Sequence, residues 1–343
     1  MSLLRVLHLA GSSVSEFYYN LSMLYARKVV QPADVKSYYA VVHPQGGWQL
    51  GSSLDALSEK ISLQEMIDQL PNIDVVVPHL FCFPGMTSFR AFFEDLLGLP
   101  VVGSPAPCTA LASNKAQTRN MVAAMGVPVA KGQQVTPGDT VAMPPPFIVK
   151  PNSEDNSLGL TLVKTEDQIA DALQKGFEFD DTLLVEEYIP GRELRVGIIE
   201  RDNKLHVPSM IEYLFPKDHT IRTVHDKYDL QANGTPEKQP EKPVAKPQCP
   251  AQVTPALFEE IADAARQAHV ALGCRDYSLF DFRVHEQTGQ PYLLEAGLFW
   301  SFGEISMISR MLLADGESLE DVVLQVWRNA SQRNKLPCGS VNE

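Results

Sequence analysis

The first hundred residues alternate between short apolar runs and amphipathic segments, and this alternation limits the possible folds more than any other feature of the sequence. Strand-like runs lie at 4–10, 37–43 and 74–79, and segments with helical periodicity lie at 16–30, 63–70 and 86–97. Such alternation predicts an α/β architecture with an open parallel sheet. Ligands of these sheets bind beyond the carboxyl ends of the strands, where residues 11–15 and His79 lie. His79 is therefore a functional candidate, with packing inside the domain as the alternative.

The rest of the chain has mainly strand patterns with a few helices. Helices are expected at 114–125, 165–176, 255–272 and 319–329, and strands at 147–151, 182–188 and 193–199. We expect these three strands to form one antiparallel sheet. Residues 231–250 contain five prolines with alternating Lys and Glu, which predicts a mobile loop. Because this loop lies between strands, it is a candidate active-site lid or an inert insertion.

Length and composition indicate a globular protein. The chain has 343 residues, of which 44% are hydrophobic, enough for two or three packed domains. Its formal net charge of −13 argues against a nucleic-acid partner, because phosphate contacts need a basic face. The five cysteines are scattered without CxxC spacing, which is typical of reduced thiols in the cytoplasm. No stretch approaches a membrane span, so we expect a cytoplasmic protein with no membrane partner.

Two acidic residues in the C-terminal part, Asp281 and Glu295, are candidate metal ligands. Strand patterns at 280–284 and 292–296 flank a turn, and a hairpin centred on Thr288 would place the two carboxylates opposite each other. Their Cβ atoms would then be roughly 5 Å apart, and like charges in that arrangement destabilise a sheet. A cation between them would remove the repulsion, and hard oxygen ligands favour Mg²⁺, which usually binds substrate phosphates as well. The alternative is a different register with both acids solvated.

Phosphate-binding candidates occur singly, because the chain has neither a GxxxxGK[ST] nor a GxGxxG loop. Lys115 begins a helix, and Lys150 ends a strand. A small, polar segment at 151–159, which includes Ser157, follows Lys150, and its backbone N–H groups can surround a phosphate. A solvated lysine beside a surface loop is the alternative for each position.

Three acidic residues surround a strand and turn at 186–193. Glu186, Glu187 and Glu193 can accept hydrogen bonds from an adenine amine and from ribose hydroxyls. An exposed charged turn is the alternative for this segment.

The order of these motifs, followed by Lys227-Tyr228 and then by the acid pair, closely resembles the ATP-grasp ligases. Residues 99–104, 112–118 and 249–251 look like the branch of the D-alanine–D-alanine ligases, and the resemblance covers about residues 3–325. It implies an ATP-grasp fold with an N-terminal parallel-sheet domain, a small central domain and a C-terminal domain with an antiparallel sheet. The implied limits are 1–105, 106–190 and 191–343, with a mobile loop at about 217–250.

The resemblance also implies ATP and Mg²⁺ as cofactors and a role for each site residue. Lys115, Lys150 and Ser157 would hold phosphates, and Lys227 would contact the γ-phosphate. Glu186 and Glu187 would accept hydrogen bonds from the adenine amine, the backbone around Ile189 would contact the edge of the ring, and Glu193 would bind the ribose. Asp281 and Glu295 would hold Mg²⁺. The catalytic candidates are Lys227, Tyr228, His79 and Ser306. The family's chemistry is formation of an acyl phosphate followed by attack of an amine.

The acceptor half departs from the dipeptide ligases. Leu279 stands where they have an arginine that stabilises an oxyanion, Gly297 stands where they have an asparagine metal ligand, and Asn156 replaces a substrate-binding serine. Glu304 is a candidate replacement for the missing metal ligand. Phe299, Trp300 and Phe302 predict an apolar pocket, with a core cluster as the alternative.

Residues 295–310 look like the subfamily of ligases that joins an amino acid to mycosporine-glycine. We therefore expect an ATP- and Mg²⁺-dependent C–N ligase that joins serine, threonine or a similar amino acid to mycosporine-glycine, giving an imine, ADP and phosphate. The alternatives are a dipeptide ligase of the L-amino acid or D-alanine type, which acts through an acyl phosphate, and a non-catalytic ATP-binding regulatory protein. The implied partners are small molecules, an amino acid plus a carbonyl or carboxylate acceptor, and a second copy of the chain in a homodimer.

Overall fold

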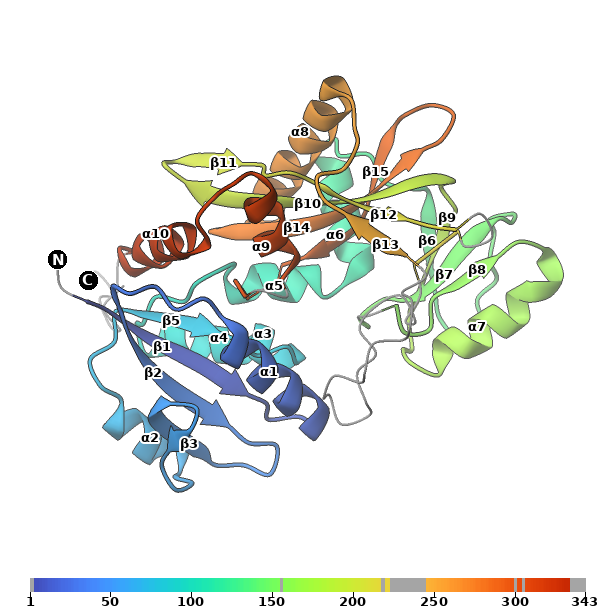
Figure 1. Cartoon of the computed structure of the whole chain (residues 1–343). Helices are drawn as coiled ribbons and strands as arrows, with labels where there is room; N and C mark the ends of the chain where they lie inside the picture. The colour runs from blue at the N-terminus through green and yellow to red at the C-terminus, as the bar shows by residue number, and fades with distance from the viewer. Residues whose placement is uncertain are drawn as a thin grey trace, which may run out of the picture.

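The computed structural model describes residues 3–154, 157–216, 220–222, 245–298, 301–303 and 306–333. Three sheets organise the described chain (Figure 1). The N-terminal sheet has the order β4-β3-β2-β1-β5, the central sheet β6-β9-β7-β8, and the C-terminal sheet β13-β12-β10-β14-β15, with β11 paired to β10. The ATP-grasp architecture implied by the sequence therefore has its expected combination of parallel and antiparallel sheets.

The N-terminal sheet has a parallel centre and an antiparallel edge. Its strands are β1 (Leu4–Gly11), β2 (Val35–Val42), β3 (Trp48–Ser53), β4 (Ala56–Leu57) and β5 (Val75–Pro78). β1 pairs in parallel with β2 and β5, as the alternation predicted, whereas β3 and β4 add an antiparallel hairpin that it did not predict. The core of this sheet is apolar, as expected for parallel strands covered by helices.

The helices of this part are shorter than predicted. They are α1 (Glu16–Lys28), α2 (Leu63–Gln69), α3 (Phe83–Met86), α4 (Ser88–Ala91) and the π-helix η1 (Phe92–Leu96). The single helix predicted at 86–97 is wrong, because Thr87 has φ −118° and ψ −82°, which interrupts the helical backbone. The hydroxyl of Thr87 donates a hydrogen bond to the Phe83 carbonyl oxygen at 2.7 Å and holds this break in place.

The central sheet is antiparallel and carries one helix. Its strands are β6 (Gly132–Val135), β7 (Phe147–Pro151), β8 (Thr161–Val163) and β9 (Leu183–Glu187). The 3₁₀ turn η2 (Glu166–Gln168) leads into α7 (Ile169–Phe177), whose apolar residues pack on Phe147 and Val185. The lysine and acid candidates on β7 and β9 therefore belong to a small, separately packed sheet.

The C-terminal sheet contains the acid pair. Its strands are β10 (Gly191–Arg201), β11 (Lys204–His206), β12 (Ile211–Leu214), β13 (Lys246–Gln248), β14 (Tyr277–His285) and β15 (Pro291–Gly297). The prediction that residues 193–199 share a sheet with 147–151 and 182–188 is wrong. Gly191, at φ +142°, separates β10 from β9, and a Cβ there would lie 1.9 Å from the Val284 carbonyl oxygen, so only glycine permits this close approach of β10 to β14.

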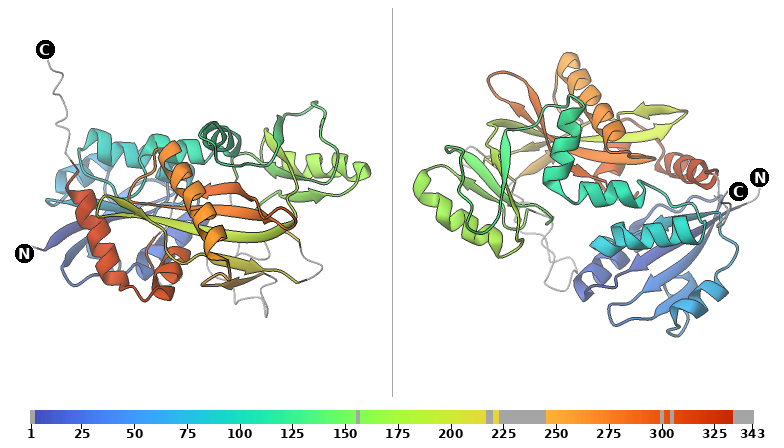
Figure 2. Two further views of the ribbon diagram at one scale, coloured as in Figure 1. Left: turned by 90° about the horizontal axis from the view of Figure 1, so that it is seen from above. Right: turned by 180° about the vertical axis from the view of Figure 1, so that it is seen from behind.

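Both faces of the C-terminal sheet are covered (Figure 2). The remaining helices are α5 (Ala106–Ala112), α6 (Lys115–Ala124), α8 (Pro255–Ala271), α9 (Met307–Ala314) and α10 (Leu319–Ser331). Residues of α5, α6 and α8 pack with Phe280 and Phe282 on one face. On the other face Leu279 packs with α9 and α10, in an apolar cluster that also includes Val6 and Val75 of the N-terminal sheet. The N-terminal and C-terminal sheets thus share a core.

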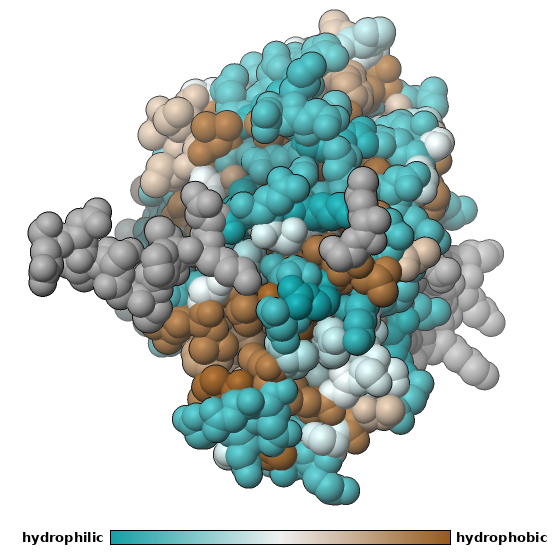
Figure 3. Space-filling view, turned by 90° about the vertical axis from the view of Figure 1, so that its left-hand side faces the viewer, coloured by the Kyte–Doolittle hydropathy of each residue, from teal (hydrophilic) through white to brown (hydrophobic). Residues whose placement is uncertain are grey.

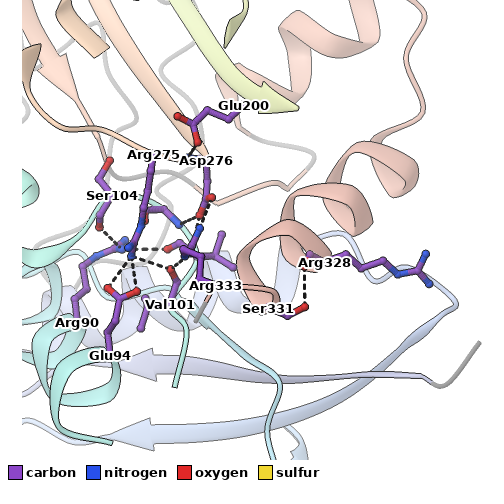
Figure 4. Close-up of polar contacts among 12 residues, drawn as sticks. Arg90, Glu94, Val101, Ser104, Glu200, Arg275, Asp276, Arg328, Ser331 and Arg333 are labelled. Carbon is purple, nitrogen blue, oxygen red and sulfur yellow. Dashed lines mark hydrogen bonds and ion pairs between the residues drawn. The ribbon is translucent and has the colours of Figure 1, made fainter. Parts of the chain in front are cut away.

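A buried polar network joins the same two parts of the chain (Figure 4). Arg275 donates to both carboxylate oxygens of Glu94 at 2.6 Å. Asp276 accepts from the Gly103 backbone N–H at 2.6 Å and from Arg333 at 2.6 and 3.0 Å. Arg275 and Asp276 directly precede β14, whereas Asp281 lies at the middle of that strand, so these bonds anchor the sheet on which the acid pair lies.

The surface on the side of the two termini is mixed. Hydrophilic residues predominate in the upper part of this face, and hydrophobic residues gather lower down, toward the N-terminal sheet (Figure 3). Within the part of the chain that the structure describes, no helix combines the length and the apolar character needed to cross a membrane.

Candidate active site

The hairpin of β14 and β15 places Asp281 opposite Glu295, which confirms the predicted pairing. The register then departs from the uniform hairpin expected about Thr288. Phe282 pairs with Leu293, so Leu294 is an extra residue in a bulge beside Asp281. The carbonyl oxygen of Leu294 accepts a hydrogen bond of 3.3 Å from Lys150 Nζ on the central sheet. The bulge therefore links the acid pair to Lys150, which the sequence analysis identified as a candidate phosphate-binding residue.

An open cavity lies between the central and C-terminal sheets and contains the ATP and Mg²⁺ candidates. It is lined by Lys115, Lys150, Ser157, Glu186, Glu187, Ile189, Glu193, Asp281 and Glu295, which are all the described residues proposed for these two ligands. Ile148, Leu160 and Leu294 line the same cavity. The cavity therefore combines apolar side chains with many charged ones, which suits a small ligand that has both an apolar and a charged part.

The two lysines of the cavity are paired with acidic residues. Lys150 Nζ lies 2.5 Å from Glu186 Oε2, and Arg119 Nε lies 3.4 Å from the other oxygen of the same carboxylate. Lys115 Nζ lies 3.8 Å from Glu295 Oε1 and also donates to the Glu154 carbonyl oxygen. Lys115 is the first residue of α6 and directly follows the N-cap residue Asn114. The helix start therefore fixes the direction in which the Lys115 side chain leaves the backbone. Both ammonium groups are largely buried, and phosphate oxygens are a stronger competitor for them than water.

The acid pair provides hard oxygen ligands of the kind that Mg²⁺ prefers, although both oxygens of Asp281 also accept hydrogen bonds from Arg195 and Arg222. Asp281 is buried and the side chain of Glu295 is 32% exposed, so one carboxylate is fixed and the other is accessible from the cavity. Mg²⁺ is usually held by one or two carboxylates together with water and substrate phosphates. Among the residues that the structure describes, no group of three or more His, Cys, Asp or Glu side chains is arranged to hold a metal ion. A metal here would complete its shell with water and phosphate oxygens.

Three arginines that contact acidic residues of the site were not predicted from the sequence; Arg222 and Arg283 line the cavity, and Arg195 does not. Arg195 binds Asp281, Arg283 Nη1 lies 3.6 Å from Glu193 Oε2, and Arg222 contacts both acids, at 3.0 Å from Asp281 Oδ2 and 3.3 Å from Glu193 Oε1. The signal was present in the strand periodicity. Arg195 follows Glu193 by two residues and Arg283 follows Asp281 by two, so each shares a sheet face with a proposed ligand.

Of the four catalytic candidates, only His79 and Ser306 lie within the described residues. Lys227 and Tyr228 lie outside the described residues, as do Asn156, Phe299, Trp300, Glu304 and most of the predicted loop at 217–250. Ser306 is the N-cap residue of α9, and its buried hydroxyl has no hydrogen-bond partner within the described chain. Phe302 does not line the cavity. It is buried with its ring edge against Tyr277, so for this residue the pocket prediction is wrong and the core alternative holds.

His79 is buried at the end of β5 and does not line the cavity. Its Nε2 lies 3.0 Å from Nδ1 of His8, and its Nδ1 lies 3.4 Å from the Ser301 hydroxyl. Burial lowers the pKa of His79 to about 3, and burial together with His79 lowers the pKa of His8 well below its usual value. Both imidazoles are therefore neutral in the folded protein at neutral pH.

This pair predicts a loss of stability in acid. Unfolding raises the pKa of each imidazole back to about 6.5, so the stabilisation is complete above that pH and is lost as the pH falls from 6.5 toward 3. Each histidine contributes a slope of about 1.4 kcal/mol per pH unit within this window. We expect His79→Gln to flatten the pH dependence of the free energy of unfolding, measured by chemical denaturation between pH 7 and 5. A slope equal to that of the wild type would contradict this.

Comparison with known proteins agrees with this geometry. Residues 123–327, more than half of the chain, match the family model described as the D-ala D-ala ligase C-terminus. The D-alanine–D-alanine ligase of Geobacter sulfurreducens is 31% identical over 247 residues, which cover 70% of this chain and 72% of that protein. The ligase of Maridesulfovibrio salexigens is 25% identical over 292 residues, covering 84% and 90%. The chain therefore belongs to the D-alanine–D-alanine ligase family of ATP-grasp carbon–nitrogen ligases.

Solved structures support the fold over nearly the whole chain. The D-alanine–D-alanine ligase of Coxiella burnetii has a TM-score of 0.76 at 19% identity and covers 97% of this chain and 95% of its own. The D-Ala:D-Ser ligase VanG of Enterococcus faecalis has a TM-score of 0.77 at 20% identity, with coverage of 96% and 100%. A Bacillus anthracis D-alanine–D-alanine ligase, solved in complex with ATP, has a TM-score of 0.68 at 18% identity, with coverage of 97% and 98%.

Proposed function

We propose that the protein is an ATP- and Mg²⁺-dependent ligase of the dipeptide type, which joins the carboxylate of one amino acid to the amine of another. The observation that supports this most is the cavity, in which two lysines and two opposed carboxylates lie at the junction of two sheets. Family membership supports the same chemistry, because the relatives above are named as ligases that join two D-amino acids. The proposed domain limits remain 1–105, 106–190 and 191–343, and we propose a cytoplasmic homodimer.

The proposed reaction has two steps. A carboxylate oxygen of the first substrate attacks the γ-phosphorus of ATP, the bond to the β–γ bridging oxygen breaks, and ADP leaves. The amine nitrogen of the second substrate then attacks the acyl carbon, the C–N bond forms, phosphate leaves with the C–O electron pair, and the amine proton passes to solvent. Lys115 and Lys150 would neutralise phosphate charge, and Asp281 and Glu295 would hold Mg²⁺, which screens the same charge.

A second candidate is supported by one row of the sheet. Leu279 pairs with Gly297 on one side and with Gly197 on the other, so the row beside the acid pair carries no polar side chain. Leu279 and Gly297, which both differ from the residues of dipeptide ligases, are therefore directly opposite each other in the sheet. A row without the polar residues of the dipeptide ligases suits an acceptor that is not a carboxylate, and joining serine or threonine to mycosporine-glycine is the second candidate.

A single screen separates these candidates. Purified protein with ATP and Mg²⁺ is given pairs of D- or L-amino acids, or mycosporine-glycine with serine or threonine, and ADP and the product are measured. We expect ADP and a dipeptide from at least one amino-acid pair. An imine product formed only with mycosporine-glycine would support the second candidate. ATP binding without ADP from any mixture would contradict both and indicate a regulatory ATP-binding protein.

Lys150→Ala is expected to raise the ATP concentration for half-maximal turnover by about tenfold or more, because the ammonium group, which lies in the cavity 2.5 Å from Glu186, is proposed to make a charge-assisted contact with a phosphate of ATP. Steady-state ADP release against ATP concentration measures this. Lys164→Ala, at an exposed position beyond β8, is the control and should behave as the wild type. Equal ATP dependence of the two variants would exclude the assigned role of Lys150.

A further inference from the structure

Arg222 bridges two acidic residues of the cavity, Asp281, which is proposed for Mg²⁺, and Glu193, which is proposed for the ribose. Its Nη2 donates to Asp281 Oδ2 at 3.0 Å, and its Nε lies 3.3 Å from Glu193 Oε1. The side chain of Arg222 is buried, and all three residues line the cavity. A ligand that binds either carboxylate must therefore compete with the same guanidinium.

Contacts of its neighbours hold Arg222 in this position. The carbonyl oxygen of Thr220 accepts a hydrogen bond from Arg283 and another, at 3.4 Å, from the hydroxyl of Tyr188. The side chains of Arg283 and Tyr188 both line the cavity. The guanidinium carbon of Arg222 lies 4.1 Å from the ring centroid of Tyr213, within the range of a cation–π contact. Arg222 is therefore a permanent cation with a defined place between the two acids.

On the metal side, Arg222 occupies a lone pair that a metal ion would use. Asp281 Oδ2 accepts from Arg195 at 2.6 Å and from Arg222 at 3.0 Å, and a carboxylate oxygen has two lone pairs. Arg195 does not line the cavity and is paired with Asp281 through the register of β10 and β14, so we expect it to stay in place. Release of Arg222 is thus the change that opens Oδ2. A divalent cation bound to either oxygen of this carboxylate would also repel the guanidinium.

On the ribose side, the contact of Arg222 is the weaker of its two. The buried Nε of Arg222 has no hydrogen-bond partner within the described part of the chain, so its approach to Glu193 is an ion pair without a hydrogen bond. Arg283 contacts the other oxygen of Glu193, Oε2, at 3.6 Å, so Oε1 is the oxygen that Arg222 covers. A ribose hydroxyl can donate to a carboxylate oxygen. Oε1 therefore becomes available when Arg222 loses its hydrogen bond to Asp281.

A purely structural ion pair is the alternative, and Arg201 of the same strand offers a comparison. Arg201 binds both oxygens of Glu317, and neither of these residues lines the cavity. Their side chains are 20% and 24% exposed, so Arg201→Gln removes a cation from a partly buried pair outside the site. Arg222 differs because it lies in the cavity and joins two acids, so its removal should change ligand binding and not only stability.

We propose that Arg222 couples the metal site to the ribose site, because Mg²⁺ at Asp281 and a ribose at Glu193 both displace the same guanidinium. This inference rests on the proposed use of ATP and Mg²⁺. A metal ion at Asp281 removes the hydrogen bond that holds Arg222 beside Glu193, and so prepares Glu193 for the ribose. Because linkage is reciprocal, a ribose that displaces Arg222 strengthens metal binding by the same factor. Arg222 is thus a positioning residue that favours joint binding of metal and nucleotide over binding of either alone.

Adenosine makes the test specific, because it has the ring and the ribose of ATP but no phosphate that could bind Mg²⁺. Its dissociation constant is measured by calorimetry in MgCl₂ and in NaCl of equal ionic strength. We expect Mg²⁺ to tighten adenosine binding by about fivefold or more for the wild type and for the control Arg201→Gln. Arg222→Gln should bind adenosine in both salts as tightly as the wild type does in MgCl₂, with a difference of about twofold or less between the salts.

A second variant keeps the charge of the site. In Arg222→Gln two buried acids lose a counter-ion, which can lower the melting temperature, whereas Arg222→Lys retains a cation. A single ammonium group cannot make the two-ended contact of a guanidinium, so Arg222→Lys should lose most of the effect of Mg²⁺ on adenosine binding. Loss of this effect in a variant with the melting temperature of the wild type cannot come from a structural role.

Each other outcome has a distinct meaning. If Mg²⁺ tightens adenosine binding equally in the wild type and in both Arg222 variants, Arg222 does not couple the two sites and the inference is wrong. If Mg²⁺ has no effect on adenosine binding in a wild-type protein that turns over ATP, the inference is wrong and the proposed function stands. If the Arg222 variants weaken ATP and leave adenosine unchanged, Arg222 contacts a phosphate and the inference is again wrong. Wild-type protein that binds neither ATP nor adenosine would contradict the proposed function and the inference together.

Discussion

Replacing Glu295 by glutamine is expected to lower turnover by about 100-fold or more while the protein keeps its fold. Glu295 faces Asp281 across the hairpin, and an amide provides no second negative charge for a metal ion that must also bind phosphates. Because the glutamate side chain is 32% exposed, glutamine can be solvated in its place and the free energy of unfolding should change little. Raising the Mg²⁺ concentration should recover part of the activity, since the loss lies in affinity for the metal.

The control for this variant lies in the same hairpin. Glu286 is exposed in the turn between β14 and β15 and does not line the cavity, so Glu286→Gln makes the same chemical change outside the site. ADP release against Mg²⁺ concentration should overlay that of the wild type for Glu286→Gln and shift to higher Mg²⁺ for Glu295→Gln. If the two variants give the same curve, Glu295 does not hold the metal.

The lysine and acid candidates that line the cavity could be picked out from the sequence because they lie on strongly patterned elements. Lys150 ends an apolar strand, and Lys115 follows an N-cap residue, so local structure fixes where both side chains point. The opposition of Asp281 and Glu295 followed from hairpin symmetry. The bulge at Leu294 did not, because one inserted residue leaves the hydrophobic pattern of a buried strand almost unchanged.

The rest depended on contacts between segments that are distant in the chain. The sequence around Gly191 does not show that β10 belongs to a different sheet from β9. The strand changes sheets because its backbone packs closely against that of Val284, which is distant in the chain. The sequence is compatible with Phe302 either in a pocket or in the core. Its contact with Tyr277 shows that it lies in the core. The strand periodicity places Arg195 and Arg283 on the same face as Glu193 and Asp281, but which acidic residue each arginine contacts became evident only with the register of the C-terminal sheet.

Removing the carboxylate of Asp276 is expected to give the largest loss of stability, about 3 kcal/mol or more in the free energy of unfolding for Asp276→Ala. Asp276 is buried between the two parts of the chain and accepts three hydrogen bonds, from Gly103 and Arg333. Alanine would leave the Gly103 N–H without its acceptor and Arg333 without its counter-ion, and it would have to adopt the left-handed backbone, at φ +63°, that Asp276 occupies. Chemical denaturation measures the change.

The comparison variant Asp34→Ala shows why burial decides the size of this effect. Asp34 also forms an ion pair across the same two parts of the chain, at 3.0 Å from Arg328 of α10, but the two side chains are 60% and 33% exposed. Water screens such a pair and solvates whichever charge is left, so its removal should cost about 1 kcal/mol or less. If both variants lose the same stability, the buried network does not anchor the C-terminal sheet. If only Asp276→Ala is destabilised, the folded fraction of that variant should retain the ATP dependence of the wild type, since Asp276 lies outside the cavity.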